Sequence, residues 1–471
     1  MGPAQSYCLV RALDRLSQSG MSENPSESPP IAAATARRFS TNVALTLGTR
    51  LIMLAAGLGA SVIAARKLGP DGFGILAVLN VIVALAVQIG CAGLPSANTF
   101  FVSRDQRRFS RIAIMSLKFG LLMGTVLAAG VVLVAWFRPS ILGAIPFKLV
   151  VIAAIAIPFP LLLLLGLNLL LAIGDIDRLN LLDAANQIVL LLNAVFVLLL
   201  INGNLETLVV ANAIGVGVIA LALVAMIGRT ISRSTEAQTV TEPHLFRQMI
   251  RYSFKFHVSV VAGIVVLRAD LLLVNHFRGA TEAGPYAVAS QIGSLLLLLP
   301  AIISTLLFPR IAAAVADPQA LITTRVTRYA ALIMLLVCIA VVPLSFALPI
   351  IYGRPFAEAT SLLLILLPGI YLLGIESIMV QHFTGTGLPA AIPVFWLISV
   401  AFNIGLNLIF IPGYGARAAA VSSTLTYALI FLLVAIYFRR QTGNNLAHAL
   451  LIKRNELSQL PALVRLGLFS R

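Results

Sequence analysis

Charged residues are scarce in this chain. Only 11% of its 471 residues are Asp, Glu, Lys or Arg, whereas soluble globular proteins carry roughly 25%. Apolar residues make up 59%, and the mean hydropathy is +1.00. This composition excludes a soluble protein. It predicts an all-α polytopic membrane protein, because only helices and closed barrels satisfy every backbone group in lipid, and the alternating pattern of barrel strands is absent.

Residues that would carry enzyme chemistry are also few. The three cysteines, Cys8, Cys91 and Cys338, lie far apart and indicate neither a disulfide framework nor a metal site. The five histidines show no ligand spacing, and the chain contains no GxxxxGK[ST] phosphate-binding loop. No loop between the apolar runs is long enough for a separate catalytic domain. The sequence therefore predicts no cofactor, no metal and no enzyme activity.

Lys and Arg number 33 against 17 acidic residues, which gives a net charge of +16. Such an excess can indicate nucleic-acid binding, but here most basic residues occupy short loops and tails between apolar runs. In those positions they orient a membrane protein and contact anionic lipid headgroups. The expected partners are therefore membrane lipids and not nucleic acid.

The apolar runs are long enough to cross a bilayer, which requires roughly 20 residues each. Lys and Arg are more numerous in the loops on the side of the N-terminus, which predicts a multi-pass protein of the inner (plasma) membrane with both termini in the cytoplasm. The twelve predicted spans are 41–65, 73–99, 113–136, 148–172, 180–202, 206–228, 253–277, 284–308, 327–350, 359–383, 388–411 and 416–438.

An internal repeat divides the chain. Gly69 and Gly74 recur as Gly279 and Gly284, 210 residues later, each pair followed by Ala-Val. Six spans per half keep the halves in the same orientation, so the repeat is parallel and predicts two six-helix lobes around a central cleft. The predicted organisation is a cytoplasmic N-terminal tail (1–40), an N-lobe (41–228), a cytoplasmic linker (229–250), a C-lobe (251–438) and a basic amphipathic cytoplasmic tail (439–471).

The N-terminal tail contains no cleavable signal, because charges and prolines interrupt any apolar core. A polar leader follows Met21, so we expect the first twenty residues to be an upstream extension. The sequence does not decide between Met1 and Met21 as the start.

Two arginines lie deep in the first spans of the two halves. Arg50 shares a polar face with Thr46 and Ser61, and Arg268 lies in the seventh span. An ionised side chain at mid-membrane costs at least about 2.5–3.5 kcal/mol and normally faces protein or a wet cavity. A guanidinium binds phosphate through a fixed fork, so both residues are candidates for binding an anionic substrate. The alternative is that each caps carbonyls or pairs with an acid between helices.

Asp270 and Glu376 are acids within predicted spans and therefore candidates for a coupling cation or proton. Asp270 lies two residues beyond Arg268 and points to a different face, so the two do not form a pair within the helix. The alternative for both acids is a structural pairing with Arg268 or Arg50.

Lys118 and Asn403 are weaker candidates for substrate binding. Lys118 lies a turn or two inside the third span, where snorkelling to the interface explains it equally well. Asn403 shares a face of the eleventh span with Ser399 and Asn407, and hydrogen bonds between helices are the common role of such polar stripes.

Four stretches of the chain together resemble a known family. Over roughly 38–440 the sequence is similar to bacterial polysaccharide-export and oligosaccharide-lipid flippase proteins of the multidrug/oligosaccharidyl-lipid/polysaccharide exporter superfamily. The stretches are ARKLGPDGFGILAV (65–78), RADLLLVNHFRGATEAGPYAVASQI (268–292) with the following LLFPRIAA (306–313), LLPGIYLLGIESIM (366–379) and NIGLNLIFIPGYGARAAAVSSTLTY (403–427).

The resemblance implies translocation of a polyprenyl-diphosphate-linked oligosaccharide across the inner membrane for surface polysaccharide or lipopolysaccharide (O-antigen) biosynthesis. It also implies a polysaccharide polymerase and glycosyltransferases as partners. Three alternatives stay open: a cation-coupled drug or metabolite exporter of the same superfamily, a non-transporting scaffold of a polysaccharide-synthesis complex, and a polymerase or ligase. The last is disfavoured because the sequence has no large outer loop.

Overall fold

The computed structural model describes residues 30–143, 145–233, 242, 244–303, 321–386 and 389–443. Within these ranges every regular element is a helix, which confirms the predicted all-α class. Four segments discussed above lie outside the described residues: 1–29, most of the linker centre (234–241), the 306–313 motif and the amphipathic tail from 444 onward.

The described part of the first half contains seven α-helices and three short turns of other helix types. The α-helices are α2 (Pro30–Gly90), α3 (Leu94–Arg104), α4 (Phe109–Phe137), α5 (Phe147–Ala156), α6 (Pro158–Ile173), α7 (Ile176–Ala194) and α8 (Leu205–Arg233). The 3₁₀ turns η1 (Gln106–Arg108) and η2 (Pro139–Leu142) and the π-helical η3 (Val195–Leu200) connect or extend them.

The described part of the second half contains six α-helices and one 3₁₀ turn. Its elements are α9 (Leu245–Arg278), α10 (Ala280–Leu296), α12 (Leu321–Ser345), α13 (Leu348–Tyr352), the 3₁₀ turn η4 (Arg354–Phe356), α14 (Glu358–Thr386) and α15 (Ala391–Thr442).

Ten helices of the described chain are long and apolar enough to cross a membrane. Two of them, α2 and α15, each contain two predicted spans joined at a sharp kink. The kinks lie at Gly69 (φ 68°) and Gly415 (φ 62°), a left-handed backbone conformation that glycine adopts without steric cost. Each kinked helix thus has two arms, and the predicted count of twelve crossings stays a prediction.

Two predicted spans are interrupted in the structure. The span 73–99 breaks between α2 and α3, where Gly93 has a φ of 74°. The span 148–172 breaks at Ile157, because Pro158 has no N–H to continue the helix and instead begins α6. A hydropathy window cannot detect either break, since both flanking segments are apolar.

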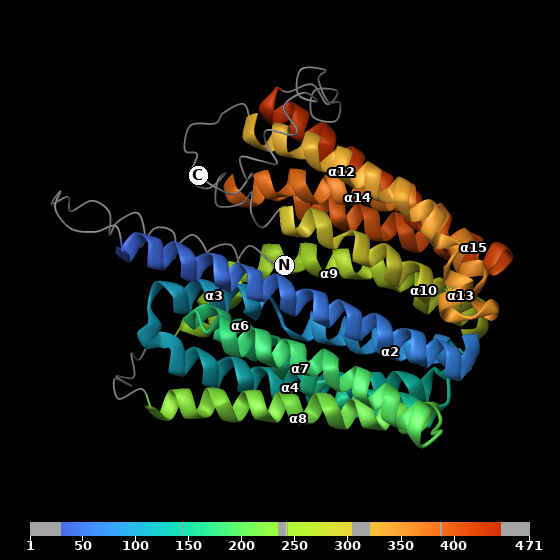
Figure 1. The fold of residues 1–471 in the computed structure, drawn as a ribbon, viewed down its shortest axis with the longest axis horizontal. Helices are drawn as coiled ribbons and strands as arrows, with labels where there is room; N and C mark the ends of the chain where they lie inside the picture. The colour runs from blue at the N-terminus through green and yellow to red at the C-terminus, as the bar shows by residue number, and fades with distance from the viewer. Residues whose placement is uncertain are drawn as a thin grey trace.

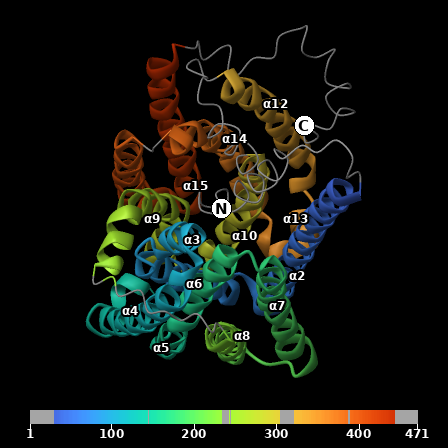
Figure 2. The same cartoon turned by 90° about the vertical axis from the view of Figure 1, so that its left-hand side faces the viewer.

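The helices form two groups, α2–α8 and α9–α15 (Figures 1 and 2). The groups meet where α2 packs against α9 and α10 and α3 packs against α9. One end of the bundle, here called the glycine end, carries α13 and the turn between α9 and α10 (Figure 1). The opposite end, here called the linker end, carries the end of α8 and the start of α9 (Figure 1).

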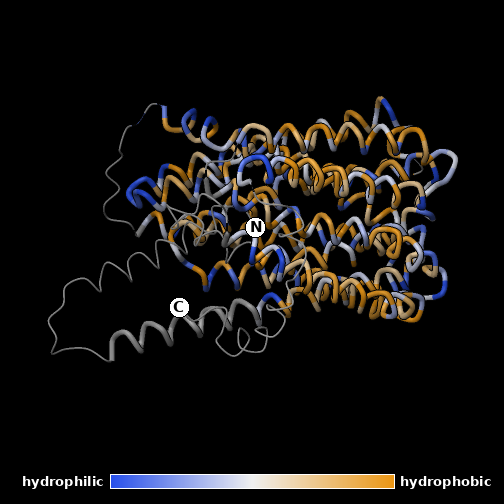
Figure 3. Tube along the Cα trace, turned by 90° about the horizontal axis from the view of Figure 1, so that it is seen from above, coloured by the Kyte–Doolittle hydropathy of each residue, from blue (hydrophilic) through white to orange (hydrophobic). Residues whose placement is uncertain are grey.

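Large apolar side chains cover the outside of the bundle, as a membrane environment requires. Examples are Leu122, Phe196 and Ile214, all more than half exposed. Hydrophobic residues occupy the middle of the helices, and hydrophilic residues gather toward the two ends (Figure 3). A chain with this surface buries it against lipid tails.

The repeated glycines form a reciprocal contact between the two halves at the glycine end. A Cβ added to Gly74 would overlap the carbonyl oxygen of Ala280, and one added to Gly284 would overlap that of Pro70. Because Ala280 and Gly284 lie 210 residues after Pro70 and Gly74, each contact is the symmetric copy of the other. We call these four residues the glycine crossing. It fixes α2 and α10 at backbone contact and relates the halves by a pseudo-two-fold axis.

The glycine crossing predicts that Gly74→Ala destabilises the protein, because a methyl group would meet backbone that cannot rotate away. We expect a loss of about 1–3 kcal/mol, measured as a lower unfolding midpoint of the purified protein. Gly130→Ala is the matched control, since a Cβ at that helical position has nothing within 4 Å and alanine is the better helix former. Equal midpoints for the two variants would contradict the close approach.

Candidate functional site

A buried carboxylate lies at the centre of the second group of helices. Asp270 of α9 is 1% exposed and accepts three hydrogen bonds. Their donors are the Tyr286 hydroxyl of α10 at 2.9 Å, the Asn407 amide in the first arm of α15 at 2.5 Å, and the Ser423 hydroxyl in its second arm. Asp270 thus joins three helices, and both arms of α15 reach it.

A second layer of polar groups continues from this carboxylate. Asn407 also donates to the Oδ1 atom of Asn403 at 3.1 Å, and Asn403 donates to the Thr426 hydroxyl at 3.4 Å. All these side chains are buried. We call Asp270, Tyr286, Asn403, Asn407, Ser423 and Thr426 the Asp270 cluster.

The charge of the cluster is not balanced by any cationic side chain of the described chain. Asp270 forms no ion pair there, although its carboxylate is deep in the protein. An unpaired ionised carboxylate is costly in such a place even when it is hydrogen-bonded. The Oδ1 atom of Asn407 is in addition buried without a hydrogen-bond partner in the described residues. A carboxylate with several neighbouring neutral oxygens can be neutralised by a proton or by a hard cation, which prefers oxygen ligands.

Arg268 lies half-buried on the same helix, two residues before Asp270. Its guanidinium interacts electrostatically with the hydroxyl groups of Tyr286 and Tyr427, but it has no hydrogen bond or ion pair with a described side chain. The predicted structural partners, Asp270 and Glu376, are therefore not its ion-pair partners in this conformation.

Arg50 lies in a different environment. It is half-buried in the first arm of α2, and its charge acts on the carboxylate of Asp183 in α7. Further along the same arm, the Ser61 hydroxyl donates to the Oε1 atom of Gln291 in α10 at 2.7 Å. The polar face predicted for this span therefore contacts polar groups of two neighbouring helices. Among the described residues, Arg50 and Arg268 interact with different side chains.

The two remaining charged candidates lie apart from the Asp270 cluster. Lys118 is exposed on the outer face of α4, beside the exposed Ile114, Leu121 and Leu122, which favours snorkelling from a lipid-facing position. Glu376 of α14 is 2% exposed, and its Oε1 atom has no hydrogen-bond partner among the described residues. Glu376 is thus a second buried acid with no ion-pair partner there.

The sequence indicated Asp270 and Asn403 separately, and the structure places both in one cluster. It also adds Tyr286, Ser423 and Thr426, which sequence reasoning missed. Ser423 and Thr426 lie in the run VSSTLTY, whose hydroxyl residues were a weak signal in an otherwise apolar helix. Among the described residues no group of three or more His, Cys, Asp or Glu side chains could hold a metal ion.

Known proteins match the chain both in sequence and in fold. The profile of a family described as "Polysaccharide biosynthesis protein" matches residues 39–315. The probable low-salt glycan biosynthesis flippase Agl15 of Haloferax volcanii is 24% identical over 200 residues, which are 41% of this chain. The match spans 42% of the length of that archaeal protein.

Solved structures of two kinds of transporter share the fold. An inward-facing multidrug resistance MATE family transporter of the MOP superfamily superposes with a TM-score of 0.68 and 14% identity, covering 83% of this chain and 94% of that chain. The lipid II flippase MurJ in an inward closed conformation superposes with a TM-score of 0.65 and 14% identity, covering 90% of this chain and 93% of that chain. An outward-facing MATE family transporter superposes with a TM-score of 0.61 and 14% identity, covering 86% of this chain and 95% of that chain.

The family profile covers more than half of the chain, and the fold is that of membrane transporters and flippases. The chain therefore belongs to the polysaccharide biosynthesis protein family of the multidrug/oligosaccharidyl-lipid/polysaccharide exporter superfamily.

Proposed function

We propose that this protein is a flippase that translocates a polyprenyl-diphosphate-linked oligosaccharide across the inner membrane for surface polysaccharide or lipopolysaccharide (O-antigen) assembly. The observation that carries this proposal is Arg268, a half-buried guanidinium with no ion-pair partner in the described chain of a polysaccharide biosynthesis family member. A fixed, permanently charged fork matches the diphosphate that links lipid to sugar. The flippase relatives in sequence and fold support the same class of substrate.

In this mechanism the diphosphate is held by Arg268 and the lipid tail stays in the bilayer. Arg50 supplies a second positive charge from the other half, shared with Asp183. We propose that 41–228 and 251–438 act as an N-lobe and a C-lobe that rock about the inter-lobe contacts. Release of the glycine crossing would then open the cleft between the lobes toward the glycine end.

We further propose that the Asp270 cluster takes up the coupling cation or proton. A cation bound by the carboxylate would compete with the hydrogen bonds from Asn407 and Ser423, which are in different arms of α15. Occupancy therefore changes how α15 is held against α9. A ligand that binds one conformation better shifts the equilibrium toward it, and this is the basis of coupling. Glu376 is the second candidate for this role.

The orientation follows from the distribution of basic residues. We propose that the linker end faces the cytoplasm together with both termini, and that the glycine end faces outward. A polysaccharide polymerase and glycosyltransferases in the same membrane would be the partners of such a flippase.

A cation-coupled drug or metabolite exporter is the second candidate function. It is favoured by the MATE family fold and by two buried acids, Asp270 and Glu376, which suit cationic cargo. The basic character of Arg268 speaks against it. Transport assays that compare a polyprenyl-diphosphate sugar with a cationic dye in the same proteoliposomes decide between the two.

Removal of the charge of Asp270 should separate coupling from binding. Asp270→Asn is expected to abolish the dependence of transport on an ion gradient while the protein still binds its cargo, because the amide keeps most hydrogen bonds but attracts no cation. The measurement is initial flipping rate in proteoliposomes with and without a proton or sodium gradient. Glu376→Gln is tested in parallel. Unchanged gradient dependence in both variants would remove the two acids from coupling.

The arginines give a second test. Arg268→Ala is expected to lower flipping of a fluorescent polyprenyl-diphosphate sugar about 10- to 100-fold, the cost of a charged hydrogen-bonded contact. Arg268→Lys should recover part of the rate, because lysine keeps the charge and lacks the fork. A smaller loss is expected for Arg50→Ala, since Arg50 already interacts with Asp183.

Membrane abundance is measured beside the rate, and Arg229→Ala is the control for loss of one exposed positive charge. If Arg268 were a structural residue, Arg268→Ala would lower abundance and the lysine variant would restore it. Normal flipping by a well-inserted Arg50→Ala/Arg268→Ala double variant would exclude the phosphate-binding mechanism.

Labelling of single cysteines tests the orientation. In a chain whose native cysteines are replaced by alanine, Ala357→Cys at the glycine end should react with an impermeant thiol reagent applied to intact cells, because this position is exposed. Ser232→Cys, exposed at the linker end, should react only after the cells are opened. The reverse pattern would mean that the protein is inserted the other way.

A further inference from the structure

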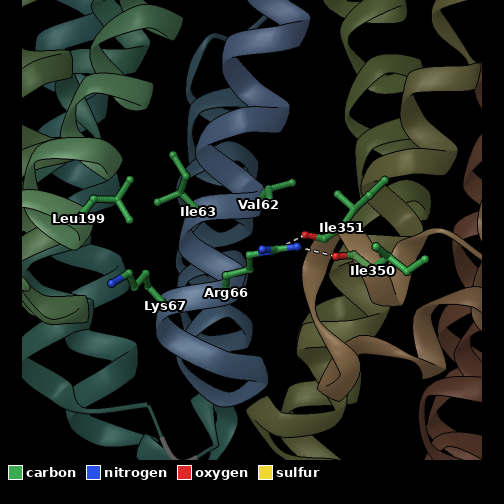
Figure 4. A pocket seen from close by; sticks show the side chains of 7 residues that line it. All are labelled: Val62, Ile63, Arg66, Lys67, Leu199, Ile350 and Ile351. Atoms are coloured by element: carbon green, nitrogen blue, oxygen red, sulfur yellow. Dashed lines mark hydrogen bonds between the residues drawn. The ribbon is translucent and has the colours of Figure 1, made fainter.

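A cavity of about 630 Å³ lies between the two halves near the glycine end. It is lined by the end of the first arm of α2, by η3 from the first half and by α13 from the second half (Figure 4). This volume falls in the range of roughly 300–1,000 Å³ that is usual for small-molecule sites. The cavity is separate from the Asp270 cluster, and none of its lining residues takes part in the proposed transport.

Two cationic side chains lie at the cavity and point in opposite directions (Figure 4). The Nε atom of Arg66 donates to the carbonyl oxygen of Ile351 at 2.7 Å. Its Nη2 atom donates to the carbonyl oxygen of Ile350 at 2.5 Å. It thereby satisfies carbonyls at the end of α13 and joins α2 to the other half. Its remaining donor capacity and its full charge stay at the cavity.

Lys67 points toward the opposite wall, where Leu199 of η3 lies (Figure 4). The lysine is exposed, and it has no hydrogen bond or ion pair with any residue that the structure describes. Arg66 and Lys67 are adjacent positive charges, and neither forms an ion pair with a described residue. Together they attract an anion to this position. The π-helical turn that forms the wall is a rare geometry that is frequent at functional sites.

The rest of the lining is aliphatic: Val62, Ile63, Leu199, Ile350 and Ile351. Ile350 is 75% exposed, so the cavity opens on the lipid-facing surface. Val62 and Ile63 lie one helical turn, about 6 Å, before the two cations and therefore deeper in the membrane. The two cations lie at the depth of the lipid headgroups, and the aliphatic wall lies deeper. This arrangement is complementary to the phosphate and the acyl chain of a phospholipid.

We propose that this cavity binds an anionic glycerophospholipid of the surrounding bilayer, with its phosphate at Lys67 and Arg66 and an acyl chain along the aliphatic wall. The lining offers no side-chain hydroxyl, amide or carboxylate to a sugar, so a glycan headgroup gains nothing here. A small phosphate-bearing headgroup instead gains favourable contacts with the two positive charges. We therefore assign the site to a resident lipid, and competition with a polyprenyl diphosphate in the test below separates this lipid from the cargo.

The position of the site gives the lipid a structural effect. Its phosphate contacts α2, and its chain contacts η3 of the first half and α13 of the second. A ligand that bridges both halves stabilises the arrangement in which the cavity exists. Anionic lipid in the leaflet at the glycine end thus favours the conformation described above, in which the glycine crossing is closed.

The test measures lipid binding and does not require transport. Purified, delipidated full-length protein is titrated with phosphatidylglycerol or with phosphatidylcholine of the same acyl chains, and bound lipid is counted by native mass spectrometry. We expect saturable binding of phosphatidylglycerol. Lys67→Gln should weaken it about fivefold, the effect of one basic residue near an anionic headgroup. Leu199→Trp should also weaken it, because the larger ring narrows the aliphatic wall along which the acyl chain lies.

The matched control is Arg138→Gln, which removes one exposed positive charge at the same end and outside the cavity. It should leave binding unchanged, and Lys67→Arg should retain binding. Both Lys67 and Leu199 are exposed, so unfolding midpoints are expected to match the wild type. If Lys67→Arg lost binding as Lys67→Gln does, the site would not depend on the positive charge at this position.

Four results would overturn the proposal. Equal weakening by Arg138→Gln would mean diffuse surface attraction, and equal binding of phosphatidylcholine would mean that charge plays no part. Binding of glycerol phosphate as strong as that of phosphatidylglycerol would indicate a free-anion site without a chain. Preferential displacement of phosphatidylglycerol by a polyprenyl diphosphate, lost in Lys67→Gln, would assign the cavity to the cargo.

Discussion

The absence of water in the bilayer core constrains every part of this structure. A polar group that leaves water there must find its partner within the protein, and each unsatisfied group costs several kcal/mol. The backbone meets this demand by forming helices throughout the described chain. The buried side chains meet it by gathering, as Asn403, Asn407 and Thr426 do around one carboxylate. Each hydrogen bond between such helices contributes only about 0.6 kcal/mol, so the cluster adds little to the stability of the bundle.

The two charged residues of α9 illustrate a division of roles within one helix. Asp270 is enclosed by hydroxyl and amide donors from α10 and α15, whereas Arg268, two residues before it, lies half-buried beside two tyrosines. Their separation by about 200° around the helix keeps the negative site in the protein interior and leaves the positive one accessible. One helix thus carries a buried negative side chain on one face and a half-buried positive side chain on another. This gives the two sites a short physical connection, because any rotation of α9 moves both.

Sequence patterns predicted the parts of the fold that depend on local properties. Long apolar runs gave the helices, and the spacing of Gly69 and Gly74 against Gly279 and Gly284 gave the repeat. The depth of Asp270 followed from its position in an apolar run. Its partners could not be predicted, because Tyr286 and Ser423 reach it only through the rotation of α10 and α15 about their axes. Loop lengths do not fix that rotation. The same reason hid the proximity of Arg50 to Asp183, although both residues were visible as charges within or near apolar runs.

The reciprocal geometry of the glycine crossing has a mechanical consequence. Gly74 approaches Ala280 and Gly284 approaches Pro70, so the two contacts sit on opposite sides of one axis. A rotation of the halves about an axis in the plane of the crossing would tighten one contact while it loosened the other, and the tight side has no space left. Separation along the line between the halves relieves both at once. The junction therefore resists gradual tilting of α2 against α10, and both contacts must be released together before the two helices can separate.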